Sequence, residues 1–403
     1  MQQTLRIGFV SVQDATDIHT WSGLPANMLQ ELRKLNIQVE VYSPLSQQLK
    51  HLLLPFAIWA KIFHTKMPLD RFQLLLNSYA RQIKRLIRER PVDVIFSTSS
   101  IPITTLDCSQ PIVFWTDAVF HSMLDYYKGG FSHMSPTSIE RGKVQEQTAL
   151  NRCTFAVYAS IWAASHASQL ASPSKIHVIP FGASFAIPHT LADVRLWVRD
   201  KQMQRSSAGR TQTCHLLFIG VDWVRKGGAI AVEVARLLNE AGIATKLTVV
   251  GCRPEEATPE FVNVLGFISK STSDGKTQLQ TLLRQADFFI LPSLAEAAGI
   301  VFCEASAFGL PSLSYATGGV PDYVRNGVNG VCLPVGTPAS EFATAIQEIL
   351  ENPGQYEALC LGAYNEYQTR LNWQTSIRAL VDLCQRALQD SQCPEQRTVH
   401  QEY

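Results

Sequence analysis

Two glutamates, Glu296 and Glu304, stand with seven residues between them in the segment FFILPSLAEAAGIVFCEASAFGLP (288–311). The first follows a short apolar run typical of a buried strand, and the second lies in a pattern that predicts a helix starting near Gly299. The start of a helix leaves unpaired backbone N–H groups and a positive dipole end, which together attract anions. Carboxylates beside a bound anion suit a ligand that also carries hydroxyl groups, because carboxylate oxygens accept hydrogen bonds. A phosphorylated sugar or a nucleotide meets both requirements.

A pair of cations, Arg225 and Lys226, precedes two glycines at a predicted strand-to-helix turn. Cations at such a turn neutralise a phosphate that also contacts backbone amides. The predicted helix start near the glutamates offers the amides of Ala298, Gly299, Ile300 and Val301 for the same purpose. The structural alternative is that the cations and Glu296 are surface residues and that Glu304 interacts with the helix dipole.

Alternating strands and helices must position these residues. Apolar runs predict strands at 5–12, 39–42, 92–97, 112–116, 155–159 and 176–180, and again at 215–220, 246–250, 261–268 and 288–291. Helical patterns between them predict two doubly wound α/β domains, whose ligands collect beyond the carboxyl ends of the strands. The loop Trp21 to Pro25, which contains Gly23, and His121 both follow predicted strands, although a lone His is more often structural.

The length of 403 residues predicts two or three domains. A polar stretch that includes QMQRSSAGRTQT is typical of a linker, so we predict a first domain at 1–188, a linker at 189–212 and a second domain at 213–372. Apolar residues at helical spacing predict a final helix over about 373–388.

The composition excludes several classes of protein. A 46% hydrophobic and 17% charged chain is typical of a packed globular protein, and a net charge of +1 argues against nucleic-acid binding. Nine cysteines without C-x-x-C indicate neither a zinc site nor a disulfide framework, and the absence of Asp-x-Asp predicts no metal. The first residues read as a strand rather than a signal peptide, and no apolar run is long enough to span a bilayer. We therefore expect a cytoplasmic protein.

The densest apolar stretch, LLLPFAIWAKIF, lies within 51–64. Packed core or a subunit contact is the usual role of such a stretch. It could also lie on a membrane surface or line a substrate cleft, but it has no basic face of its own, which argues against strong interfacial binding. Peripheral membrane contact stays open, and the oligomeric state is not predicted.

The pattern E-A-A-G-I-V-F-C-E-A-S-A-F-G-L-P resembles the E-x7-E signature of the retaining glycosyltransferases of family 4, and Lys226-Gly227 matches the family's Lys-Gly pair. The resemblance implies the GT-B fold: two Rossmann-like domains facing an interdomain cleft, with a C-terminal helix that crosses back to the first domain. Departures are Ser22-Gly23 where many members have Gly-Gly, Val221 where an Arg is usual, and Asp322 where many have Glu.

Roles for individual residues follow from this resemblance. Glu296 would hold the sugar hydroxyls and His121 would join it in the sugar-binding cleft. Lys226 and Arg225 would bind the diphosphate, Glu304 the ribose, and the segment with Phe267 and Ile268 the base. Gly23 would lie in a loop that faces the donor phosphates or the acceptor. The donor would be a nucleotide sugar bound to the second domain, the unidentified acceptor would bind to the first, and no cofactor or metal would be needed.

Three other functions compete with this one. A GT-B epimerase or phosphorylase shares the two-domain design and differs in its products. A non-catalytic sugar- or nucleotide-binding protein would keep the fold without turnover. A nicotinamide-linked oxidoreductase fits less well, because no G-x-G-x-x-G follows the first strand.

Overall fold

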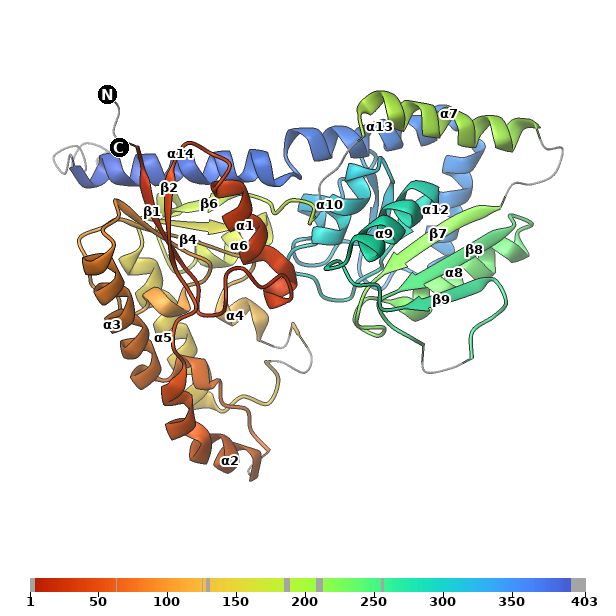
Figure 1. Cartoon of the computed structure of the whole chain (residues 1–403). Coiled ribbons are helices and arrows are strands. Elements are labelled where there is room, and N and C mark those ends of the chain that lie inside the picture. The colour runs from red at the N-terminus through yellow and green to blue at the C-terminus, as the bar shows by residue number, and fades with distance from the viewer. Residues whose placement is uncertain are drawn as a thin grey trace, which may run out of the picture. The chain divides into compact units, whose positions relative to one another are not determined.

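The structure is a computed structural model that describes residues 4–62, 64–124, 126–127, 131–184, 189–207, 213–254 and 257–392. The chain divides into two compact units, one of Met1–Ile179 with Ser376–Tyr403 and one of Pro180–Thr375. Each unit is built on a six-stranded sheet (Figure 1). All the strand pairs are parallel, so the predicted doubly wound α/β class is confirmed.

The first sheet has the strand order β2-β1-β3-β4-β5-β6. Its strands are β1 (Arg6–Val10), β2 (Gln38–Tyr42), β3 (Val94–Ser97), β4 (Ile112–Thr116), β5 (Phe155–Tyr158) and β6 (Ile176–Val178). The central strands β3, β4 and β5 are buried along their whole length, as expected for apolar runs in a parallel sheet covered on both faces. The order changes direction between β1 and β3, which makes their carboxyl ends the position where such sheets bind ligands.

Helices cover the first sheet and connect its strands. They are α1 (Leu24–Leu32), α2 (Leu54–Ile62), α3 (Gln73–Glu89), α4 (Phe120–Met123), α5 (Pro136–Arg152) and α6 (Ile161–Ala167), with short 3-10 turns η1 (Thr20–Gly23), η2 (Gln48–Leu53), η3 (Leu69–Arg71), η4 (Ile101–Ile103) and η5 (Pro173–Lys175).

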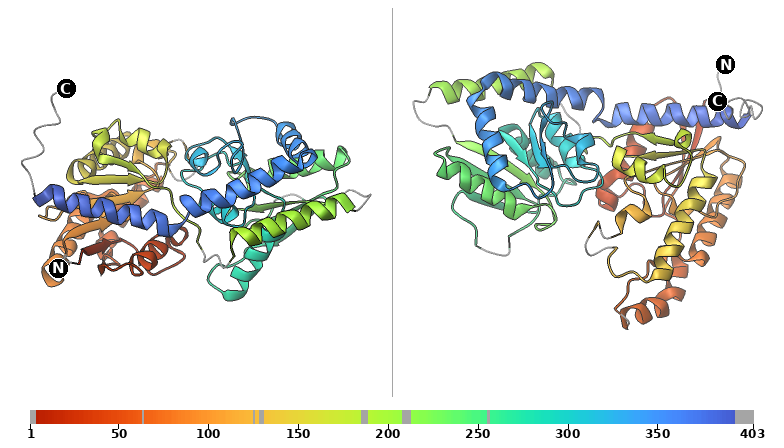
Figure 2. Two further views of the ribbon diagram at one scale, coloured as in Figure 1. Left: turned by 90° about the horizontal axis from the view of Figure 1, so that it is seen from above. Right: turned by 180° about the vertical axis from the view of Figure 1, so that it is seen from behind.

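The C-terminal helix α14 (Trp373–Gln392) joins this unit from Ser376 onward. Its apolar face, which includes Leu380 and Cys384, is fully buried, and the Arg386 guanidinium lies over the Phe155 ring. Figure 2 shows this part of α14 alongside the first unit in both views. The predicted return of the last helix to the first domain is confirmed.

The second sheet has the order β12-β11-β10-β7-β8-β9. Its strands are β7 (Cys214–Ile219), β8 (Thr245–Val250), β9 (Val262–Gly266), β10 (Phe288–Ile290), β11 (Ser312–Tyr315) and β12 (Gly330–Leu333). The chain runs from β7 outward to β9 and then returns to the other side of β7 with β10. The loops that follow β7 and β10 therefore meet at the switch point of this sheet.

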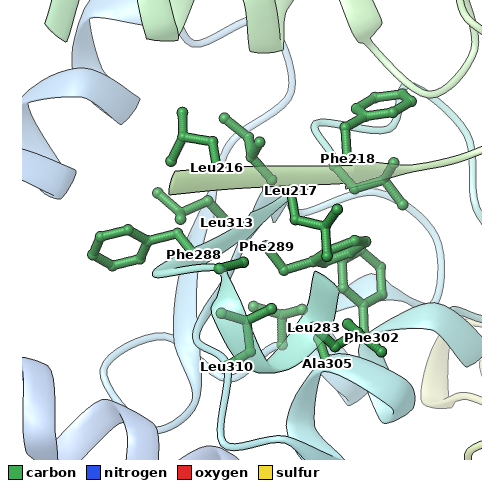
Figure 3. Packing of buried hydrophobic residues seen from close by; sticks show 14 of the residues in the cluster. Leu216, Leu217, Phe218, Leu283, Phe288, Phe289, Phe302, Ala305, Leu310 and Leu313 are labelled. Carbon is green, nitrogen blue, oxygen red and sulfur yellow. The ribbon is translucent and has the colours of Figure 1, made fainter. Parts of the chain in front are cut away.

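The core of the second unit lies between this sheet and its helices α7 (Leu191–Ser207), α8 (Gly228–Glu240), α9 (Ser273–Gln285), α10 (Ile300–Ala307), α11 (Val320–Tyr323), α12 (Ala339–Glu351) and α13 (Pro353–Thr369). Helix α8 packs against α12, while α13 packs against both α7 and α10. Phe289 on β10 contacts Phe302 on α10, and side chains of β7 and β10 fill the space around them (Figure 3).

Helix α7 occupies most of the segment that the sequence predicts as a linker. Val194 and Val198 bury one side of α7, and farther along the helix Lys201 and Arg205 are also mostly buried. Because two of the buried residues of α7 are cations, its buried side does not appear as a repeat of apolar residues in the sequence. The linker prediction is therefore wrong for 191–207. The remainder, 208–212, lies outside the described residues.

The apolar composition of 51–64 predicts that its side chains are buried, but several of them are exposed. In this segment Leu53 is buried, but Leu54, Phe56, Ile58 and Ile62 are 49 to 66% exposed, so the packed-core prediction is wrong for these side chains. None of the helices in the described part of the chain combines the length and apolar content that a membrane crossing requires.

Candidate functional site

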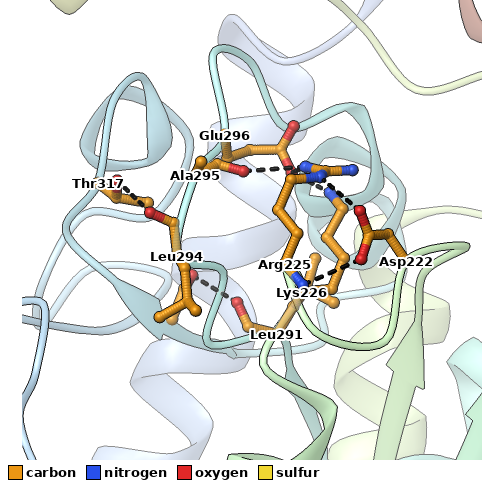
Figure 4. Close-up of polar contacts among 9 residues, drawn as sticks. Asp222, Arg225, Lys226, Leu291, Leu294, Ala295, Glu296 and Thr317 are labelled. Carbon is orange, nitrogen blue, oxygen red and sulfur yellow. Dashed lines mark hydrogen bonds and ion pairs between the residues drawn. The ribbon is translucent and has the colours of Figure 1, made fainter. Parts of the chain in front are cut away.

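The loops after β7 and β10 bring the predicted catalytic and diphosphate-binding residues together (Figure 4). The ammonium group of Lys226 contacts Glu296 Oε2, and the Arg225 guanidinium lies 3.7 Å from the same oxygen. The side chains of Lys226 and Glu296 are 12% and 11% exposed. A carboxylate shared by two cations forms a polar site at this switch point. The site is mostly shielded from solvent but still reaches the surface.

Hydrogen bonds between the two loops fix this arrangement. The backbone N–H of Leu294 donates to the Arg225 carbonyl at 2.8 Å, and the Arg225 guanidinium donates to the Ala295 carbonyl at 2.9 Å. The same guanidinium donates to Asp222 at 3.2 Å. Arg225 therefore joins the loops in addition to facing Glu296, a role that the sequence does not reveal.

Gly227 is required where the two loops cross. Its φ is +74°, and a Cβ at this position would lie 2.2 Å from the Pro292 carbonyl oxygen. A side chain would thus be strained by the backbone conformation and would also collide with the loop that carries Glu296. The Lys226-Gly227 pair thus combines a cation with the glycine that lets the loop after β7 approach the loop after β10.

The amino end of α10 lies directly after this loop. Gly299 is the N-cap residue, and no described side chain caps the helix. The first N–H groups of a helix have no partner inside it, so the amides of Ala298, Gly299, Ile300 and Val301 are suited to an anion. The backbone of Glu296 is held on the other side, where its carbonyl accepts a hydrogen bond from Gly319 at 2.9 Å.

Glu304 is fully buried on α10. Its Oε1 accepts a hydrogen bond from the ammonium group of Lys270, whereas its Oε2 is buried without a hydrogen-bond partner in the described structure. A buried carboxylate oxygen without a partner is unusual and costs free energy until a donor reaches it. Lys270 is missing from the sequence prediction, although its place in the loop after β9 is a signal that could have identified it.

Phe267 and Ile268 lie in that same loop, between β9 and Lys270. Gly266 ends the strand with a φ of +71°. The chain then turns so that Phe267 is 69% exposed while Ile268 packs partly against the core. An exposed phenylalanine offers a flat apolar surface close in sequence to the cation that pairs with Glu304.

The other two predicted site residues, Gly23 and His121, belong to the first unit. Gly23 is the N-cap of α1 with a φ of +79°, and it follows two further residues with positive φ, Trp21 and Ser22. His121 lies on α4, half-buried, and its Nε2 is buried without a hydrogen-bond partner in the described structure. Burial lowers the pKa of His121, and the charges of His166 and Lys143 lower it further.

A cavity of about 300 Å³ opens at the switch point of the first sheet. Its lining combines the apolar side chains of Val12, Trp21, Pro25 and Ile101 with the polar or charged side chains of Ser11, Gln13, Thr20, Gln47, Lys50, Asp70, Thr98, Ser99, Thr116 and Asp117. The Trp21 indole N–H lies 3.4 Å from an Asp117 oxygen, which ties the loop after β1 to the loop after β4. Hydroxyls, carboxylates and an indole are groups that bind polyols. Trp21 and Pro25, which line the cavity, belong to the loop 21–25 that the sequence predicts as a candidate site.

A larger cavity, of about 490 Å³, lies at the opposite end of the second sheet. Its lining includes His215 and Asp287, at the amino ends of β7 and β10, and Lys201 on α7. Asp287 accepts a hydrogen bond from the His215 N–H at 2.8 Å and lies 2.5 Å from the Arg205 guanidinium. Ligands of doubly wound sheets bind at the carboxyl ends, so we assign this buried ion cluster to stability.

Among the described residues, no group of three or more His, Cys, Asp or Glu side chains is close enough to hold a metal ion. In the described part of the chain, Arg225, Lys226 and Lys270 supply positive charge for an anionic ligand at the switch point of the second sheet.

Fold and site together define a two-domain α/β protein with an anion site at the switch point of its second sheet. Comparison with known proteins makes the class more specific, because residues 213–352 match the family described as Glycosyl transferases group 1. The matched segment contains all the described residues of the site in the second unit.

Relatives with established names are similar over part of the chain. A D-inositol 3-phosphate glycosyltransferase from Mycobacterium marinum is 27% identical over 237 residues, which are 57% of this chain and 49% of the relative. The amylovoran biosynthesis glycosyltransferase AmsK from Erwinia amylovora is 26% identical over 178 residues, which are 40% and 42% of the two chains. The chain thus spans about half the length of the curated relatives it matches.

Solved structures match over nearly the whole chain. Sucrose-phosphate synthase from Thermosynechococcus elongatus has a TM-score of 0.64 at 16% identity, covering 95% of this chain and 99% of that one. HepE from Anabaena, solved in complex with UDP-glucose, has a TM-score of 0.59 at 16% identity and covers 95% and 100%. These likenesses confirm the GT-B fold class that the sequence predicts.

Proposed function

We propose that this protein is a retaining glycosyltransferase of family 4 that transfers a sugar from a nucleoside-diphosphate sugar to an acceptor. The observation that carries the proposal is the meeting of Lys226 and Glu296 beside the uncapped amino end of α10. The match of residues 213–352 to group 1 glycosyl transferases and the names of the relatives support it.

Departure of the nucleoside diphosphate is the step that the second unit assists. Negative charge builds up on the diphosphate as its bond to the sugar breaks, and preorganised donors there lower the barrier. Lys226, Arg225 and the amides at the start of α10 supply such donors. Two cations and a helix dipole take the place of a divalent ion in this proposal, so the reaction needs no metal and no cofactor.

The carboxylates recognise the hydroxyl groups of the donor. Glu296 accepts hydrogen bonds from the sugar, while the ammonium group of Lys226, which contacts Glu296, also interacts with the diphosphate. Glu304 Oε2, which has no hydrogen-bond partner in the described structure, accepts a hydrogen bond from a ribose hydroxyl. Phe267 and Ile268 contact the base, the former with an exposed ring.

The acceptor is assigned to the first unit. The cavity beside Trp21 offers hydroxyls and carboxylates that can bind a polyol. Gly23 shapes the loop next to this cavity, and His121, whose lowered pKa keeps its ring neutral at pH 7, is available to hydrogen-bond a hydroxyl.

Ligand-induced stabilisation tests the nucleotide part of the proposal. The melting temperature of the full chain is measured with each nucleoside diphosphate, starting with UDP because HepE was solved with UDP-glucose. A true ligand raises the melting temperature by mass action. If no nucleoside diphosphate or its sugar raises it, the proposal is overturned.

Substitution of Glu296 tests the catalytic part. We expect Glu296→Gln to lower sugar transfer by about a hundredfold or more, because the loss affects the reacting centre, while the diphosphate affinity changes by less than about threefold. Glu341→Gln, on the exposed side of α12, is the matched control and keeps full activity. Equal turnover in the Glu296 variant would remove this residue from the chemistry.

A further inference from the structure

Five large apolar side chains are exposed together in the short segment formed by η2 and α2. They are Leu52, Leu54, Phe56, Ile58 and Ile62, which are 62%, 49%, 49%, 61% and 66% exposed and which we call the α2 surface. Figure 1 shows α2 at the end of the first unit, away from its sheet. Single exposed apolar residues are common, but a contiguous group of this size marks an interaction site.

The segment is anchored although its surface is exposed. Leu53 is buried, and the Phe56 ring lies 5.4 Å from that of Phe72, just before α3. The nine residues of α2 extend over about 14 Å, whereas the hydrocarbon core of a bilayer is about 30 Å thick. An anchored apolar helix of this length lies on a surface and does not cross it.

Charge in this part of the chain is strongly unbalanced. Residues 43–69, which contain η2 and α2, hold three Lys and no Asp or Glu, whereas the whole chain has 35 Lys and Arg against 34 Asp and Glu. Basic residues around an apolar surface complement anionic lipid headgroups.

We propose that the α2 surface docks onto an anionic lipid bilayer. The apolar side chains enter the boundary between headgroups and acyl chains, and neighbouring basic residues pair with headgroup phosphates. A second copy of the chain is the competing occupant, but it would bring two equally basic segments together, and like charges across an interface are repulsive.

Docking would bring the cavity at the switch point of the first sheet close to the membrane. Gln47 and Lys50 line this cavity just before α2 in the chain, and Asp70 lines it just after. If the cavity holds the acceptor, a part of the inference that rests on the proposed function, then the acceptor is a polar group presented at a lipid surface. The docking itself does not depend on sugar transfer.

Vesicle binding by the full chain tests the proposal. We expect the protein to sediment with vesicles of phosphatidylcholine and phosphatidylserine, and more weakly with phosphatidylcholine alone or at high salt. The triple variant Leu54→Ser/Ile58→Ser/Ile62→Ser should bind about tenfold or more weakly, because it removes most of the apolar surface, with an unchanged melting temperature. The double variant Val144→Ser/Ile161→Ser is the control, since both residues are exposed on the same unit, at 55% and 62%, and it should bind as the wild type does.

Three outcomes would overturn the proposal. The first is a wild-type protein that does not bind anionic vesicles, and the second is equal binding by the triple variant. The third is a lipid-free dimer in light scattering that the triple variant converts to a monomer, because the α2 surface would then be a contact between copies. Nucleotide binding is unaffected by any of these results, so failure here and failure of the proposed function are distinguishable.

Discussion

At the amino end of the second sheet Lys201 and Arg205 surround Asp287, and at its carboxyl end Arg225 and Lys226 surround Glu296. The residue types are nearly the same, but the hydrogen bonding differs. Asp287 is 2% exposed, and a backbone N–H and two cations bind its oxygens. At the carboxyl end a helix start is uncapped, and the nearby Glu304 keeps a buried oxygen without a partner.

The difference separates a structural ion cluster from a ligand site. Burying a charge is costly, and only complete pairing recovers that cost within the protein. In the amino-end cluster Lys201 and Arg205 both lie within ion-pair distance of Asp287, and Lys201 also donates to the Ala286 carbonyl, so each charge already has a partner of opposite sign inside the protein. The carboxyl end has donors and acceptors that the protein does not satisfy, and a ligand can supply what is missing.

The largest expected effect follows from Asp287→Ala. This change leaves two buried cations without their carboxylate, and breaking a buried ion pair by removal of one partner costs about 3 to 5 kcal/mol. Urea denaturation should show this loss, while the nucleotide affinity of the folded variant stays at the wild-type value. A loss of less than about 1 kcal/mol would mean that the amino-end cluster is not structural.

A smaller effect is expected from Glu304→Gln, which keeps the shape of the side chain. If Glu304 accepts a ribose hydroxyl, the variant should bind the nucleoside diphosphate about 1 kcal/mol more weakly in calorimetry. The corresponding 2′-deoxy and 3′-deoxy nucleotides identify the hydroxyl, because one of them should bind the variant and the wild type equally. If the variant weakens all three ligands by the same amount, Glu304 does not contact the ribose.

The smallest effect concerns His121 in the first unit. Like Glu304, it has a buried polar atom, Nε2, without a hydrogen-bond partner in the described structure. Its pKa is lowered in the folded protein, so the unfolded chain binds this proton at a higher pH. The stabilising contribution is therefore present above the ordinary pKa of His, about 6.5, and is lost as the pH falls through the folded pKa. His121→Gln should flatten this part of the stability curve, and an NMR titration with a pKa of 6.5 or above would contradict the assignment.

The sequence predicts the parts of the molecule that depend on short-range patterns. The central strands are visible because a parallel sheet covered on both faces requires continuous apolar runs, as in IVFWT of β4. Lys226, Glu296 and the start of α10 are visible because each follows such a run at a turn. Their meeting at one switch point follows from the strand order β12-β11-β10-β7-β8-β9, which only the structure shows.

Features that depend on tertiary pairing are not visible in the same way. Helix α7 reads as polar because Lys201 and Arg205 are buried by pairing with Asp287, a residue far away in the sequence. Lys270 contacts Glu304 across 34 positions. The exposure of Ile58 and Ile62 is missed for the opposite reason, since hydropathy records how apolar a segment is and not whether anything covers it.

The path of α14 has a practical consequence for dissecting the protein. The second unit is one continuous stretch, Pro180–Thr375, whereas the first is assembled from two separated pieces. An expression fragment that stops at Ile179 would lack the strip of Ile377, Leu380 and Cys384 that the rest of its fold buries. Fragment studies of the first unit should therefore fuse 376–392 to its end through a designed loop, whereas a fragment of the second unit needs no such fusion because it is one continuous stretch.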